Sequence, residues 1–140
     1  MDNESSAIVN GTNSQKTQPP YELIGGQEAV RRFVGRFYDL MDTEPCYAEL
    51  RQLHAKDLQP MRDSLTGFLT AWLGGPRDWF DKRPGACVMS AHSDVPVNRQ
   101  TAEQWISAMG RALGESGVDP ALADAINAAF TTMAMGMARR

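Results

Sequence analysis

The residues best suited to chemistry lie in one stretch, residues 91–109, where His92 precedes a proline-containing turn and Trp105 follows on a helical face. A neutral histidine at the edge of an apolar core is a ligand that haem iron uses on one side. The N–H of Trp105, if directed into the same cavity, can act as a hydrogen-bond donor on the other side of the haem. A loop histidine and a core tryptophan explain the same spacing, so the pattern alone leaves both interpretations open.

Other kinds of site fit the chain less well. Neither histidine has a glutamate three residues before it, as a di-iron helical bundle requires. A zinc site lacks any short Cys-x-x-Cys or His-x-x-x-His pair among its four candidates, Cys46, His54, Cys87 and His92. Gly74-Gly75 ends a helix and so presents carbonyl groups, which do not bind phosphate. A Cys/His nucleophile pair stays open, supported only by the presence of both residue types.

The composition is that of one globular domain. The chain has 140 residues, of which 42% are hydrophobic and 22% charged. A net charge of −3 and the lack of a basic run argue against nucleic acid or an anionic membrane surface as partner. No apolar run approaches the roughly 20 residues that cross a bilayer. The acidic, polar N-terminus is no signal peptide, so we expect reduced cysteines and a cytoplasmic protein.

Hydrophobic periodicity predicts an all-α fold. Residues 1–19 are polar and are expected to form a disordered tail, followed by one domain over residues 20–140. Apolar residues at three- and four-residue steps predict four long helices, over residues 30–41, 58–72, 98–113 and 120–137, and a short one over 47–54. Helices packed in this way leave pockets between them. Apolar walls for a flat macrocycle are available from Phe37, Met61, Leu65, Trp72, Trp79 and Trp105.

Distal hydrogen-bond donors are also present. Dioxygen gains negative charge on haem iron, so the hydroxyl of Tyr38 and the N–H of Trp105 are the obvious groups to stabilise it. With these residues the chain resembles the group II truncated haemoglobins. The resemblance covers about residues 21–137 and rests on an ordered run of motifs: Gly25-Gly26, Phe37-Tyr38-Asp39, Leu53-His54, Phe68-Leu69, Trp72-Leu73-Gly74-Gly75-Pro76, His92 and Trp105.

The resemblance implies a two-over-two truncated globin sandwich over residues 20–140 that binds haem b (iron protoporphyrin IX). It implies that His92 is the proximal iron ligand, Tyr38 the distal tyrosine and Trp105 the group's tryptophan, with His54 joining the last two. Met61 falls where many globins keep a distal histidine, and Leu65 lies one turn later.

Two departures concern the region around His92. The family commonly has a Gly-His-Pro segment and arginines before this histidine, whereas residues 84–91 read Pro-Gly-Ala-Cys-Val-Met-Ser-Ala. The usual anchors for the haem propionates are therefore missing, and Arg83 or Arg99 is the available substitute. Val95 stands where a phenylalanine is usual.

The resemblance implies reversible binding of dioxygen, carbon monoxide and nitric oxide. Strong distal donors favour slow release, which suits sensing, scavenging, nitric-oxide dioxygenation or peroxidase-like turnover with an unidentified reductase better than bulk oxygen transport. No catalytic residue is assigned, and a monomer and a homodimer both remain open. The alternative is a haem-free all-α module that binds an apolar ligand or a protein.

Overall fold

The computed structural model describes residues 18–82 and 97–138, and these residues form helices and turns without a β-strand. The elements are α1 (Pro20–Ile24), α2 (Gly26–Thr43), the 3-10 helix η2 (Pro45–Tyr47), α3 (Ala48–Gln52), α4 (Gln59–Trp72), α5 (Asp78–Asp81), α7 (Arg99–Glu115) and α8 (Pro120–Met137). The predicted all-α class and its four long helices, α2, α4, α7 and α8, are confirmed.

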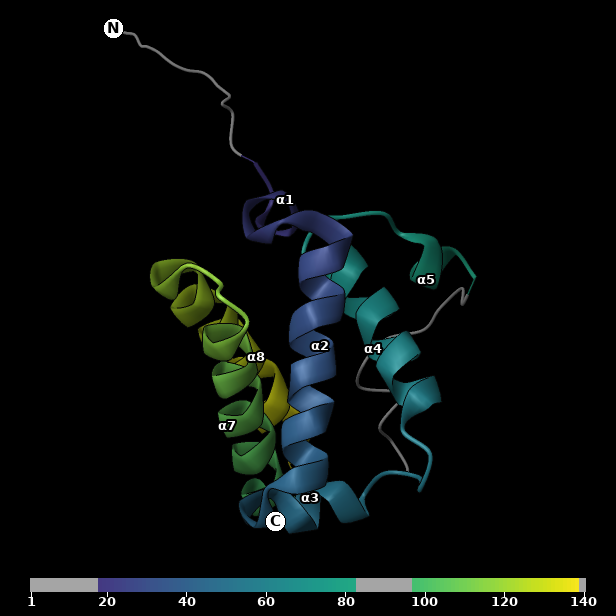
Figure 1. Ribbon diagram of the computed structural model, residues 1–140, viewed down its shortest axis with the longest axis vertical. Helices are drawn as coiled ribbons and strands as arrows, with labels where there is room; N and C mark the ends of the chain where they lie inside the picture. The colour runs from purple at the N-terminus through teal and green to yellow at the C-terminus, as the bar shows by residue number, and fades with distance from the viewer. Residues whose placement is uncertain (1–17, 83–96, 139–140) are drawn as a thin grey trace, which may run out of the picture.

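Of the four long helices, α2 lies at the centre (Figure 1). This helix packs on one side against α4 and on the other against α7, which in turn packs against α8. The result is a two-over-two sandwich. Fully buried side chains with three- and four-residue spacing form the core between the helices: Phe33, Phe37 and Leu40 of α2, Met109 and Leu113 of α7, and Phe130 of α8.

Local sequence signals set the starts of the last two helices. Asn98 and Thr101 form a capping box at the start of α7, in which the Asn98 side chain accepts a hydrogen bond from the Thr101 N–H at 2.8 Å. Asp119 accepts from the Leu122 N–H at 3.2 Å, with Pro120 in the first turn of α8. Both starts agree with the sequence prediction to within a residue.

Helix α1 is an element that the periodicity does not predict. Its only turn ends at Gly25, whose φ of 114° favours glycine. The Tyr21 N–H donates to the Leu73 carbonyl at 2.9 Å. A Cβ on Gly75 would lie 2.7 Å from the Tyr21 ring, so this glycine lets α1 pack on the end of α4. A contact with a distant segment therefore holds α1 in place.

The short helix predicted over residues 47–54 differs in detail. It is divided into η2 and α3, and α3 ends at Gln52, so His54 lies in the turn that follows. Residues 1–17 of the predicted tail lie outside the described part of the chain. Within residues 18–82 and 97–138, no helix is long and apolar enough to cross a membrane.

Candidate functional site

A cavity of about 400 Å³ is bordered by α2, α3 and the turn after it, α4, α5, α7 and α8. This volume is within the range of pockets that hold small molecules and cofactors. Its lining is mostly apolar, with a few polar groups contributed by Tyr38, His54, Ser64 and Thr101. An apolar pocket with a few convergent polar groups is a suitable environment for a flat macrocycle that carries one reactive atom.

Six of the residues predicted to form the site line this cavity: Tyr38, His54, Met61, Leu65, Trp79 and Trp105. Phe37 and Trp72 do not. Phe37 is fully buried behind the wall, and Trp72 is 37% exposed and stacks on Phe130 with ring centroids 5.0 Å apart. His92, the predicted iron ligand, lies outside the described residues.

Part of the lining was not predicted from the sequence. Phe68 and Val97 face the cavity, as do Met133 and Met137 of α8. The two methionines stand on the apolar stripe of α8, where nothing in the sequence distinguishes a cavity wall from core filling.

Tyr38 is the most distinctive polar group of the wall. It stands on α2, its ring packs edge-on against Phe37 at 4.9 Å, and its side chain is almost completely buried. Burial raises the pKa of the phenol well above its ordinary value, while the positive charge of Arg62 acts in the opposite direction. No described residue makes a hydrogen bond with the Tyr38 hydroxyl. The wall of the cavity therefore carries a protonated phenol.

Trp105 adds a second donor from α7. Its ring packs edge-on against Phe37 at 5.6 Å and against Phe130 at 5.3 Å. These two buried phenylalanines fix the indole plane while the side chain borders the cavity. Within the described ranges, no group accepts a hydrogen bond from the indole N–H.

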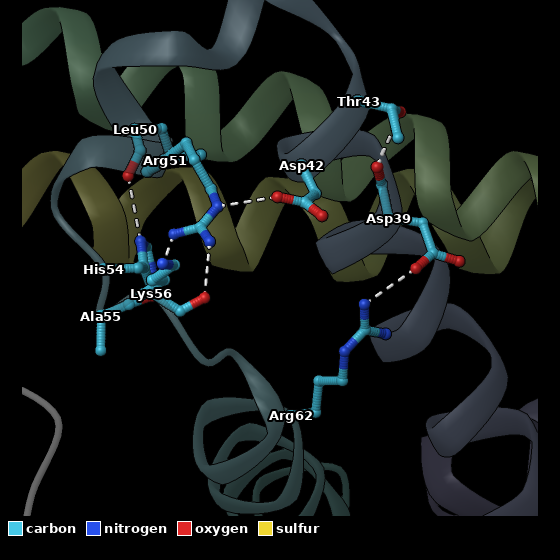
Figure 2. A network of polar contacts seen from close by, with 9 residues as sticks. All are labelled: Asp39, Asp42, Thr43, Leu50, Arg51, His54, Ala55, Lys56 and Arg62. Carbon is cyan, nitrogen blue, oxygen red and sulfur yellow. Dashed lines mark hydrogen bonds and ion pairs between the residues drawn. The ribbon is translucent and has the colours of Figure 1, made fainter.

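His54 is held by the turn that follows α3 (Figure 2). Its Nδ1 lies 3.0 Å from the Leu50 carbonyl oxygen. Since a carbonyl only accepts, Nδ1 carries the hydrogen in this contact. Arg51 holds the same turn by donating to the Ala55 and Lys56 carbonyls at 3.0 and 2.9 Å. The imidazole thereby meets the Tyr38 ring edge-on at 5.9 Å.

The α4 side of the cavity combines a partly open wall with a close helix contact. Met61 is 37% exposed while also lining the cavity. Trp79 of α5 donates from its indole N–H to the Ser64 hydroxyl at 3.3 Å. A Cβ on Gly67 would lie 2.8 Å from Trp79 Cδ1, so the absence of a side chain at Gly67 allows the tryptophan to approach α4.

Other residues were considered from the sequence for a metal site or for the surroundings of haem. The described part of the chain contains no cluster of three His, Cys, Asp or Glu side chains suited to a metal ion. Cys46 is exposed with a free thiol. Arg99 is exposed at the start of α7 and does not line the cavity. Arg83, Cys87 and Val95 lie outside the described residues.

Comparison with known proteins shows the family to which this chain belongs. The family model described as "Bacterial-like globin" matches residues 20–139. The chain is a bacterial-like globin. Among solved structures, this globin is similar to the group II 2-on-2 hemoglobin of Agrobacterium tumefaciens, with 32% identity and a TM-score of 0.85 over 90% of this chain and 98% of the other.

Two further relatives agree. A cold-adapted truncated hemoglobin of the Antarctic bacterium Pseudoalteromonas haloplanktis is 27% identical, with a TM-score of 0.84 over 88% of this globin and 99% of that chain. The group 2 truncated hemoglobin YjbI of Bacillus subtilis is 28% identical over 105 residues, which cover 75% of this chain and 76% of the relative. The predicted group II truncated haemoglobin, with its two-over-two fold, is confirmed.

Proposed function

We propose that the cavity binds haem b with His92 as the proximal iron ligand, and that the globin binds dioxygen, carbon monoxide and nitric oxide there. When bound, haem supplies an iron that takes a diatomic ligand reversibly. The apolar lining suits the macrocycle. His92 belongs to the connection between α5 and α7, and residues on both sides of that connection, Trp79 and Val97, line the cavity. Five residues span at most about 18 Å, so His92 lies within chain reach of the cavity.

The observation that carries the proposal is the Tyr38 hydroxyl, a protonated donor at an apolar cavity with no partner among the described residues. Such a group donates a hydrogen bond to a ligand that has gained negative charge. Trp105 of α7 offers a second hydrogen-bond donor, its indole N–H, and the His54 imidazole packs edge-on against the Tyr38 ring. The lining also includes apolar side chains, among them Leu65 and Phe68, which offer water no hydrogen-bond partner.

Two distal donors favour slow ligand release. A tightly retained ligand suits sensing, scavenging or redox chemistry, such as nitric-oxide dioxygenation or peroxidase-like turnover with an unidentified reductase, better than bulk oxygen transport. We place this role in the cytoplasm, where the exposed thiol of Cys46 stays reduced.

Oxygen dissociation tests the distal assignment. A hydrogen bond to a charged group contributes about 1.5–3 kcal/mol, so Tyr38→Phe and Trp105→Phe should each speed oxygen dissociation on the order of 10- to 100-fold, measured by stopped flow. Tyr47→Phe is the matched control, because Tyr47 is equally buried but its hydroxyl pairs with Ser107 at 3.0 Å, away from the cavity. Unchanged rates in both distal variants would remove the proposed donors.

A further inference from the structure

Arg62 of α4 lies directly behind the distal tyrosine, outside the cavity lining. Its guanidinium reaches across to α2, where Nη1 donates to the Gly35 carbonyl at 3.1 Å and Nη2 donates to Asp39 Oδ1 at 2.8 Å (Figure 2 shows the second contact). Gly35 and Asp39 lie one turn of α2 apart. The planar fork of the guanidinium therefore makes hydrogen bonds to both ends of the turn of α2 that carries Tyr38.

The same guanidinium lies over the Tyr38 ring. Its Cζ is 5.7 Å from the ring centroid, within the range of a cation–π interaction. The Arg62 side chain is 27% exposed, so the charge is partly shielded from water, whereas its partner Asp39 is mostly exposed. The positive charge lowers the pKa of the phenol against the larger effect of burial. A more acidic phenol is a stronger hydrogen-bond donor.

We propose that Arg62 is a positioning residue for Tyr38. Arg62 fixes the phenol ring through its two hydrogen bonds to α2, and it makes the Tyr38 hydroxyl a stronger hydrogen-bond donor to the ligand. This inference rests on the proposed role of Tyr38. A positioning role differs from a purely structural link between α4 and α2, because a structural link would change the stability of the fold without acting through the phenol of Tyr38.

A double-mutant cycle on the haem-loaded protein separates the two roles. Arg62→Met keeps the apolar stem and removes the charge and the fork. We expect it to speed oxygen dissociation about 2- to 5-fold in the parent and to leave the rate unchanged when Tyr38 is already phenylalanine. Arg36→Met is the matched control, since Arg36 also pairs with a carboxylate, Glu115, but does not contact the cavity. It should leave the rate unchanged.

A spectroscopic readout reports on Arg62 without ligand kinetics. In protein labelled with 3-fluorotyrosine, the Tyr38 resonance is assigned by its loss in Tyr38→Phe, and its ionisation is followed by ¹⁹F NMR. Loss of the cation in Arg62→Met should move that ionisation to higher pH. Arg62→Lys, which keeps the charge without the fork, should reverse part of this shift.

The outcomes are distinct. Equal rate changes on adding Arg62→Met to the parent and to Tyr38→Phe, or an unmoved Tyr38 ionisation in Arg62→Met, would overturn the positioning role. An unchanged oxygen rate in Tyr38→Phe alone would refute the role proposed for Tyr38, while the fluorine titration would still decide whether Arg62 acts on the phenol.

Discussion

Tyr38 combines two opposing influences on one hydroxyl. Burial in the wall of the cavity disfavours the phenolate, and Arg62 favours it, with burial having the larger effect on the pKa. The hydroxyl therefore keeps its proton at every pH at which the globin is expected to work. Because this donor does not titrate in that range, Tyr38 adds no pH dependence to the retention of the ligand.

The raised pKa has a consequence for stability at alkaline pH. In the unfolded chain Tyr38 ionises near pH 10, and in the folded protein only well above it. The contribution of the neutral phenol is therefore fully present below pH 10 and is lost as the pH rises towards the folded value, by up to about 1.4 kcal/mol per pH unit.

Urea unfolding between about pH 8 and pH 11.5, a range that spans the ordinary tyrosine pKa, tests this. Above pH 10 the parent should lose stability more steeply than Tyr38→Phe, which lacks the ionising group. Parallel pH profiles for the two proteins would contradict the burial argument.

Most of the residues predicted for the site line the cavity, but the sequence does not give the direction in which each one points. Tyr38 and Trp105 line the cavity as predicted, whereas Phe37 points into the core. Neighbours on a helix are about 100° apart, so a broad apolar face such as that of α2 does not reveal which of two adjacent aromatic residues borders a cavity. The contact between Arg62 and Tyr38 joins two helices and leaves no sequence signature.

The contact between α4 and α5 shapes the cavity wall. Gly67 faces the Trp79 ring, and a Cβ there would also lie 3.2 Å from Trp79 Cβ, an atom close to the backbone that moves little. Overpacking costs about 1–3 kcal/mol. Alanine also stabilises a helix by up to about 1 kcal/mol relative to glycine.

Gly67→Ala should therefore lower the free energy of unfolding by about 1 kcal/mol in urea titrations, the net of these two effects. Gly114→Ala is the control, because a Cβ added to Gly114 of α7 would have nothing within 4 Å. This variant should gain up to about 1 kcal/mol. A stability gain in both variants would show that Trp79 does not depend on Gly67.

Which elements were predictable follows from where their stabilising contacts come from. The starts of α7 and α8 depend on local caps, and both were predicted. Helix α1 and the first turn of α3 have distant partners: Leu73 for Tyr21, and Gln104 of α7, whose side chain accepts from the Leu50 N–H at 3.0 Å. Propensity and periodicity are local and do not register such contacts.

At the scale of the whole molecule, the two-over-two sandwich explains why a chain this short contains a cavity. The helices α2 and α4 meet α7 and α8 across a core whose centre is closed by Phe37 and Phe130, and the cavity borders this aromatic layer. The all-α fold class was predictable because apolar residues recur at three- and four-residue steps in four long segments of the sequence. The size and lining of the cavity were not, because they depend on how side chains from several segments meet.

The most direct test of the haem site is the absorption spectrum of the haem-supplemented protein in its ferric, dithionite-reduced and CO-bound forms, for the parent, His92→Ala and His54→Ala. The chain has only these two histidines. We expect a stoichiometric, sharp Soret band that shifts with CO, persists in His54→Ala and is lost in His92→Ala. A well-folded parent without that band would contradict the haem site and favour a haem-free binding module, and an unchanged band in His92→Ala would refute the proximal ligand.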